Sequence, residues 1–244
     1  MHVKKERVEI IMNNFYFFKD KNDEYRNNIL NIQAGREGLF NTIFDLINTN
    51  LNEGDTVLDI GNGGIIRCNY KKLHRLICAD LFINENVANK YLYIENVSFE
   101  TANILDLNKF EDNSFDTVIA CGVLHHIAGK SKNKTKENVI TALLECNRKI
   151  KPNGKILIVE DMVYKWFEMF EIIFYPIIQT ICKTLGFGYI YQYSLQSFSR
   201  LLEYCKLKTD IIPIRPGEYG WFMNLKIPIV LMPSRPFFFI VRKK

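Results

Sequence analysis

Short apolar runs alternate with longer mixed segments through the middle of the chain, and this pattern predicts an α/β fold. Two mixed segments, 37–51 and 137–150, repeat their apolar residues at helical spacing. Near-continuous apolar strands that alternate with helices are typical of a doubly wound parallel sheet, covered on both faces. Five runs have the composition of such strands, at 56–60, 76–79, 97–102, 115–120 and 155–159.

The C-terminal third adds one more helix and two more strands to this pattern. Ser194 is a suitable N-cap for a helix over 194–205. Strands are predicted at 209–214 and 236–242, which brings the expected sheet to seven strands. Glu160 and Asp161 follow the fifth run and are expected to cap its end.

Three segments do not follow the alternation. Residues 1–36 form an N-terminal cap segment whose aromatic cluster either packs on the core or covers a ligand. Residues 162–192 read as a helical aromatic insertion with three open interpretations: a core helix, a cover over substrate, or a membrane-surface contact through 162–185. The long connector 215–235 contains several aromatics and is expected to fold on the substrate side.

Composition fits a single domain, with 37–244 as its main body. The 244 residues are 48% hydrophobic and 24% charged, and the formal net charge is +5. Much of that positive excess lies in 130–136 and 242–244, so the sequence predicts no continuous basic surface that would bind nucleic acid. Six cysteines without paired spacing read as reduced core residues, and the charged first residues are unlike a signal peptide, which favours a cytoplasmic protein.

A glycine-rich turn after the first strand predicts a binding site. The strand runs into Asp59 and then into Gly61 and Gly63, and ligands of open α/β sheets bind at the carboxyl ends of strands. The dinucleotide fingerprint does not fit, because Ile66 stands where its third glycine would be. Asp59 would repel a pyrophosphate and attract a cationic ligand.

A second acidic residue supports a nucleoside-containing ligand. Asp80 ends the second strand, nineteen residues after Gly61. Nucleoside-binding βαβ units place an acidic side chain there, where it accepts hydrogen bonds from both ribose hydroxyls.

Five stretches together resemble the class I S-adenosylmethionine-dependent methyltransferases of the small-molecule, or type 11, group. They are Val-Leu-Asp-Ile-Gly-Asn-Gly-Gly, Asp80, Phe-Glu-Asp-Asn-Ser-Phe-Asp, Gly-Val-Leu-His-His-Ile and Ile-Lys-Pro-Asn-Gly-Lys-Ile-Leu-Ile-Val-Glu. Their order and spacing match over about residues 40–161. The resemblance implies a Rossmann-like sheet with an antiparallel last strand and S-adenosylmethionine as cofactor, but it does not specify the acceptor.

The resemblance also implies which residues hold the cofactor. Asp59 would lie near the methionine amino group and Asp80 at the ribose. The family's usual aspartate at the adenine amino group aligns here with Asn103, and Asp106 is the alternative. The remaining expected contacts come from the glycine turn, the apolar walls of the adenine site and the end of the fourth strand: Gly61, Gly63, Leu81, Ile104 and Cys121.

Two adjacent histidines follow the fourth strand. The stretch resembles sugar O-methyltransferases, in which the first histidine and an acid after the fifth strand act together. Those positions are His125, as general base, and Glu160, as its orienter or an acceptor contact, with His126 in a lesser role. The alternative is that the histidines are only a polar strand cap. No third ligand accompanies them, so no metal site is predicted.

These features predict a methyltransferase that modifies a hydroxyl of a small molecule, with a sugar or nucleotide-linked sugar favoured. Two alternatives remain open. One is an N- or C-methyltransferase of a lipid-like or other small acceptor, and the other is a non-catalytic protein with the same fold. DNA is disfavoured as a substrate because the signature for flipped bases is missing after the fourth strand. The sequence does not predict the oligomeric state.

Overall fold

A computed structural model describes residues 37–244, except 84, 185–189, 216–218, 223–224 and 229–231. The predicted cap segment 1–36 lies outside these residues. Within the described part of the chain, no helix has the length and apolar character needed to cross a membrane.

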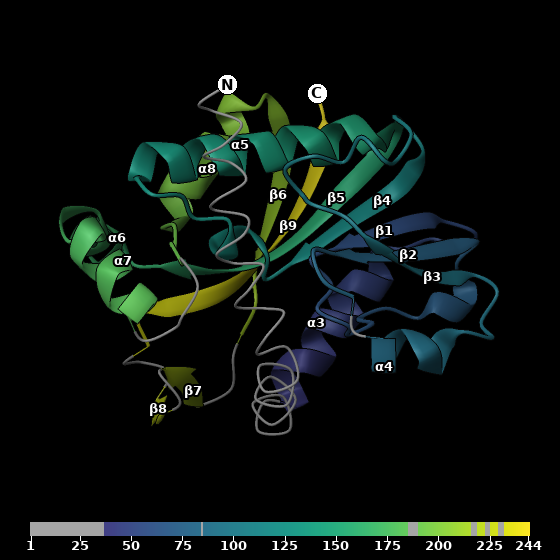
Figure 1. Cartoon of the computed structure of the whole chain (residues 1–244), viewed down its shortest axis with the longest axis horizontal. Coiled ribbons are helices and arrows are strands. Elements are labelled where there is room, and N and C mark those ends of the chain that lie inside the picture. The colour runs from purple at the N-terminus through teal and green to yellow at the C-terminus, as the bar shows by residue number, and fades with distance from the viewer. Residues whose placement is uncertain (1–36, 84, 185–189, 216–218, 223–224, 229–231) are drawn as a thin grey trace.

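Seven strands form one sheet in the order β3-β2-β1-β4-β5-β9-β6, as predicted for a doubly wound α/β fold (Figure 1). The first five strands pair in parallel, and β9 pairs antiparallel with both β5 and β6. The strand bounds are β1 Thr56–Ile60, β2 Arg75–Asp80, β3 Val97–Thr101, β4 Phe115–Cys121, β5 Ile150–Val163, β6 Leu207–Pro213 and β9 Ser234–Lys243.

The central strands are largely apolar because both faces of the sheet are covered there, whereas the edge strand β6 is mostly exposed. On β5, Ile156 and Ile158 join the core cluster beneath helices α5 (Lys132–Lys149) and α8 (Leu195–Tyr204). Leu157 and Val159, which point the other way, join the cluster beneath α3 (Glu37–Thr49). Figure 1 shows α5 and α8 on one side of the sheet and α3 on the other.

The crossovers near β2 are short. Between β1 and β2 the chain forms only a 3-10 turn at Tyr70–Lys72, as expected from the brevity of that segment. Between β2 and β3 it forms α4 (Glu85–Ala88) and a second 3-10 turn at Asn89–Tyr91. The loop after the glycine turn is therefore held by side chains and not by a long helix.

The bounds of two predicted elements are wrong. Helix α5 begins at Lys132 and not near 137, because the Ser131 hydroxyl accepts from the Lys134 N–H and caps the lysine-rich first turn. Strand β5 extends to Val163, because β9 pairs with it as far as Ser234. Glu160 and Asp161 therefore lie inside the strand and do not cap it.

Within the predicted insertion the chain forms two helices, α6 (Lys165–Ile173) and α7 (Tyr175–Thr184). They project beyond the sheet at the end where β5 leaves it (Figure 1). The predicted connector contains a two-stranded hairpin of β7 (Tyr219–Phe222) and β8 (Leu225–Pro228).

Candidate active site

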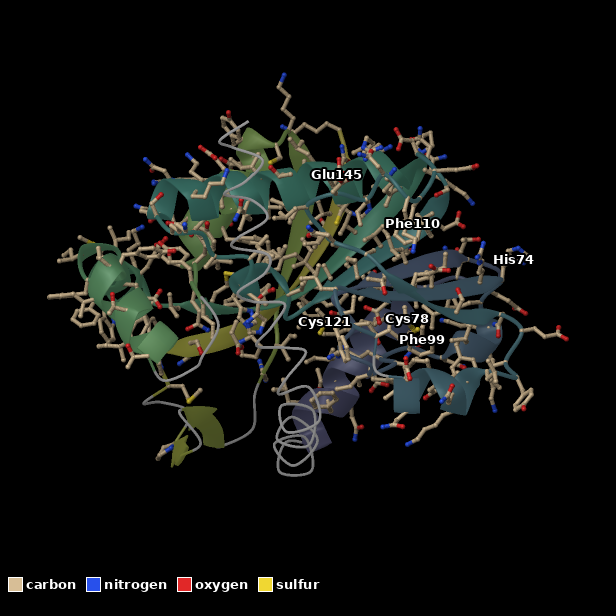
Figure 2. All side chains as sticks on the ribbon, viewed as in Figure 1. His74, Cys78, Phe99, Phe110, Cys121 and Glu145 are labelled. Carbon is tan, nitrogen blue, oxygen red and sulfur yellow. The ribbon has the colours of Figure 1, made fainter. Side chains whose placement is uncertain are left out.

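The predicted site residues gather where the parallel strands end. Strands β2, β1, β4 and β5 are direct neighbours in the sheet, so their carboxyl ends form one continuous edge. Figure 2 shows Cys121 at this edge in the middle of the molecule, whereas His74, just before β2, lies at the opposite edge. The residues predicted to hold the cofactor, on β1 and β2, thus lie beside those predicted to serve the acceptor, on β4 and β5. We call these two groups the donor half and the acceptor half.

The two glycines of the turn have different roles. Both have positive φ, 71° at Gly61 and 61° at Gly63. A Cβ on Gly61 would lie 2.3 Å from Cγ2 of Val123. The missing side chain at Gly61 therefore makes room for Val123 and not for a ligand. A Cβ on Gly63 would meet nothing within 4 Å, so the backbone there faces open space.

Asp59 is a buried carboxylate with only one of its oxygens hydrogen-bonded. Its Oδ2 accepts from the Asn62 side-chain amide, and its Oδ1 is buried with no partner among the described residues. Burial raises the pKa of Asp59 to about 6, although the nearby charge of Arg67 and the Asn62 hydrogen bond oppose the shift. The Oδ1 of Asn62 is also buried without a partner in this part of the structure. The turn therefore presents two unsatisfied acceptor oxygens.

Asp80 at the end of β2 is tied to the glycine turn. Its Oδ2 accepts from the Gly63 N–H at 2.9 Å and its Oδ1 from the Phe82 N–H at 3.3 Å. Burial raises the pKa of Asp80, and the backbone N–H groups oppose that shift. Each oxygen keeps a further lone pair, so the carboxylate can still accept from two hydroxyl groups.

The residues expected around adenine follow β2 and β3. Leu81 is half-buried, and Ile104 is part of the core cluster beneath α5. The Asn103 side-chain oxygen accepts from the Leu105 N–H at 3.0 Å and keeps one lone pair for another donor. Asp106, the alternative, is exposed, and its carboxylate accepts from the Asn108 N–H.

Cys121 ends β4 beside the donor half. Burial raises the pKa of its thiol to about 11, so the side chain stays neutral at physiological pH. The next residue, Gly122, donates its N–H to the Val159 carbonyl and holds the β4 and β5 ends together.

The acceptor half is built around a contact between His125 and Glu160. His125 Nδ1 lies 2.7 Å from Glu160 Oε2, and Glu160 Oε1 accepts from the Leu124 N–H at 2.6 Å. Glu160 is 3% exposed, whereas the His125 side chain is 22% exposed. Burial lowers the pKa of His125, but the Glu160 carboxylate and Asp161 raise it by more, so the net shift is upward.

His126 has a different environment from its neighbour. Its ring centroid lies 4.0 Å from that of His125. Burial and the His125 charge together hold the pKa of His126 well below the usual value. His126 therefore stays neutral where His125 titrates. Within the described residues no group of three metal-binding side chains is arranged around an ion site.

Several residues of the site were missed from the sequence. Asn62 and Arg67 shape the donor half, and Arg67 donates to the carbonyls of Asn62 and Ile65. The Leu124 N–H and the chain at Tyr191, whose N–H donates to the His125 carbonyl, fix the acceptor half. The position of Asn62 between two glycines was a usable signal, but the backbone contacts leave no trace in the sequence.

Comparisons with known proteins agree with this arrangement. Residues 58–158 match a family described as a methyltransferase domain. No curated protein sequence matches the chain significantly. The matched residues run from β1 to β5 and include the glycine turn, Asp80 and both histidines.

Solved structures share the fold over nearly the whole chain, and two of the following three are named as methyltransferases. The 1,6-didemethyltoxoflavin-N1-methyltransferase of Burkholderia thailandensis has a TM-score of 0.67 at 14% identity, with 97% of this chain and 89% of that chain covered. The methyltransferase bound to the Haloferax volcanii Trm112 activator has a TM-score of 0.61 at 13% identity, covering 92% and 95%. The DhpI–SAH complex has a TM-score of 0.60 at 10% identity, covering 96% and 97%.

The TM-scores show that the chain shares the fold of these structures, and the family match spans the glycine turn, Asp80 and both histidines. Residues 58–158 therefore form a methyltransferase domain of the class I S-adenosylmethionine-dependent type.

Proposed function

We propose that the protein methylates a hydroxyl group of a small molecule, and that a sugar or nucleotide-linked sugar is the favoured acceptor. The observation that carries this proposal is the contact of 2.7 Å between His125 Nδ1 and Glu160 Oε2. A carboxylate at Nδ1 favours the tautomer in which Nδ1 carries the proton and Nε2 has a free lone pair. Nε2 can then accept the proton of a hydroxyl.

The donor half fits S-adenosylmethionine. The unpartnered buried oxygens of Asp59 and Asn62 would accept from the methionine amino group, which also supplies the positive charge that a buried carboxylate needs. Gly63 leaves open space for the ligand, and Asp80 would bind the ribose hydroxyls. Leu81, Ile104, Asn103 and Cys121 would contact the adenine and the methionine chain.

When bound, the donor supplies an electrophilic methyl group on sulfonium and leaves as a neutral thioether. The protein then has two tasks, to orient the acceptor in line and to remove its proton. Glu160 holds the His125 ring in one orientation, and the Leu124 N–H holds Glu160. His126 is neutral and adjacent, so it can contact the acceptor without competing for the proton.

The test combines an acceptor panel with a pH profile. The protein is incubated with labelled donor and nucleotide sugars, phenols, lipids and nitrogen heterocycles, and kcat/KM is measured for the best acceptor. Because the reactive histidine must be unprotonated and its pKa is raised, the rate should increase with pH to a midpoint above the ordinary value of about 6.5.

Glu160→Gln provides the decisive variant. It removes the largest of the charges that raise the His125 pKa and leaves burial, which lowers it, together with the smaller effect of Asp161, so the midpoint should move to lower pH while the rate falls. An unchanged midpoint in this variant, or a flat wild-type profile, would refute the proposed base.

A nitrogen acceptor is the second candidate. One structural neighbour, with the same fold, is named as an N1-methyltransferase. A ring nitrogen that carries a proton also needs a base, so the same dyad could serve it. Labelling of the heterocycles and not of the sugars in the panel would favour this candidate.

A further inference from the structure

Helices α6 and α7 have the reverse of the polarity expected for surface helices. Their exposed sides carry apolar side chains spaced three and four residues apart, the spacing that places side chains along one side of a helix. We call these exposed side chains together the aromatic face. Its members are at least 38% exposed: Trp166, Met169, Phe170, Ile173, Phe174, Ile177 and Ile181.

The acidic residues of α6 point inward. Glu168 is 2% exposed and accepts hydrogen bonds from the Ser194 and Ser197 hydroxyls and from Lys165. Glu171 is half-buried, and burial raises its pKa to about 7. Consequently none of the described side chains of α6 and α7 places an exposed carboxylate on the aromatic face.

Buried hydrogen bonds and ring contacts hold α6 and α7 against the rest of the protein, and they determine which side of these helices is exposed. The Tyr175 hydroxyl donates to the Gly129 carbonyl and contacts Thr135 Oγ1 at 2.9 Å. Tyr191 packs edge-to-face against Tyr193 with ring centroids 4.8 Å apart, and its hydroxyl lies 3.3 Å from Glu168 Oε1. These buried contacts fix which side of α6 and α7 is turned outward.

Basic side chains lie beside part of the aromatic face. The Tyr175 contact places the start of α7 beside the basic turn that leads into α5, where Lys130 and Lys132 are exposed. Lys165 begins α6, but its ammonium is paired with the buried Glu168 and does not add to this border. Arg235, exposed on β9, lies over the Tyr164 ring at 5.8 Å. An apolar stripe with aromatic residues and a cationic border is complementary to an anionic lipid surface.

We infer that the aromatic face is a docking site for an anionic membrane surface. Helix α6 has nine residues and α7 has ten, so each is about 15 Å long, half the thickness of a hydrocarbon core. Such helices can lie along the interface with their apolar side chains among the acyl chains. The exposed Trp166 side chain suits that depth, because its ring is apolar and its N–H group can reach water.

Docking there would bring the acceptor half close to the lipid. Helix α6 begins two residues after β5, the strand of Glu160, and the Tyr191 N–H is bonded to the His125 carbonyl. The inference goes beyond the proposed function and does not depend on it, since membrane binding can be measured without methyl transfer.

The experiment is sedimentation of the full chain with vesicles of phosphatidylcholine containing about one-third phosphatidylserine, compared with pure phosphatidylcholine. The wild type should bind the anionic vesicles, and added salt should weaken that binding. Trp166→Ser with Ile173→Ser should weaken it at least about tenfold, since each change removes a large apolar group from the interface. Lys130→Glu with Lys132→Glu should weaken binding to the anionic vesicles only.

The matched control is Leu92→Ser with Tyr93→Ser. These side chains are 68% and 90% exposed, and they precede β3 at the other end of the sheet. Equal loss of vesicle binding in this control, or no binding by the wild type, would overturn the inference. A lipid-free dimer that the Trp166 and Ile173 changes dissociate, seen by sedimentation equilibrium, would assign the face to a second copy and also overturn it.

A second measurement keeps the inference testable if the double variant misfolds. Trp221→Phe leaves Trp166 as the sole tryptophan of the chain. Its fluorescence should shift to the blue on addition of anionic vesicles and should be quenched by brominated acyl chains. Unchanged emission with vesicles present would contradict insertion of α6.

Discussion

Two buried carboxylates on the same edge of the sheet, Asp59 on β1 and Glu160 on β5, differ in the hydrogen bonds that the protein gives them. Glu160 is 3% exposed, and each of its oxygens has a partner, from the Leu124 N–H and the His125 ring. Asp59 is 1% exposed, and only one of its oxygens has a partner in the described structure. The acceptor half is therefore satisfied internally, while the donor half has an acceptor oxygen for a ligand.

This difference has energetic consequences. A buried carboxylate without enough donors is destabilised in its charged form, so the pKa of Asp59 lies at about 6. The Glu160 carboxylate instead stabilises the protonated form of His125 and so raises the pKa of that ring. Changes in the acceptor half should therefore act on the rate, and changes in the donor half on affinity and on the stability of the ligand-free protein.

The largest expected effect is that of His125→Ala on turnover. Loss of a general base should lower kcat by roughly 10²–10⁴-fold and remove the rising limb of the pH profile. Donor affinity measured by calorimetry should stay within about twofold, since His125 belongs to the acceptor half. His126→Ala is the control, and it should be milder. An active His125→Ala enzyme with an unchanged pH profile would mean that Glu160 or an acceptor without a proton controls the reaction.

The glycine turn joins the two halves, and its glycines should respond differently to substitution. Gly61→Ala forces a Cβ against Val123 at positive φ, and we expect a loss of about 2–5 kcal/mol of unfolding free energy. The Cβ of Gly63→Ala meets open space, so the unfolding free energy should fall only by the backbone cost of about 1–2 kcal/mol. The main effect of this variant should be weaker donor binding. Urea denaturation and calorimetry measure both, and equal destabilisation by the two variants would contradict the contact with Val123.

The sheet and the donor half could be predicted because their signals are local. Apolar runs identify buried strands, and glycines followed by an acid on the next strand identify the nucleoside end. The sequence could not show that Gly61 makes room for Val123. That contact joins the ends of β1 and β4, which become neighbours only when the sheet forms.

The acceptor half depended on long-range pairing. Glu160 was expected just beyond the fifth strand, but pairing with β9 extends that strand past it. The longer strand places the Glu160 carboxylate 2.7 Å from His125 Nδ1. The sequence also could not show which side of α6 faces outward. Its periodicity allows either face to be buried, and the choice is made by Ser194 and Ser197, which come from the N-terminus of α8.

Asp59→Asn should separate stability from function in the donor half. The folded pKa of Asp59, about 6, lies above its unfolded value, so this group's contribution to stability is lost as pH rises through about 4 to 6. The neutral variant should therefore be more stable than the ligand-free wild type above pH 6, by up to about 3 kcal/mol, and the two should converge below about pH 4. Donor binding should weaken in the same variant. Thermal or urea unfolding across pH checks this, with exposed Asp106→Asn as the control.

The smallest expected effect in this comparison is that of Asp80→Ala, because Asp80 is already partly satisfied by the protein. Its carboxylate accepts from Gly63 and Phe82, so removal should loosen the turn slightly and weaken donor affinity by about 1.5–3 kcal/mol, the scale of hydrogen bonds to a charged group. Asp80→Asn retains an acceptor for the Gly63 N–H and should recover part of the affinity. Calorimetry with the donor and with methionine alone distinguishes the sources of the loss. If Asp80 binds the ribose, affinity for the whole donor should fall while affinity for methionine stays the same, whereas equal losses would assign Asp80 only to the shape of the turn.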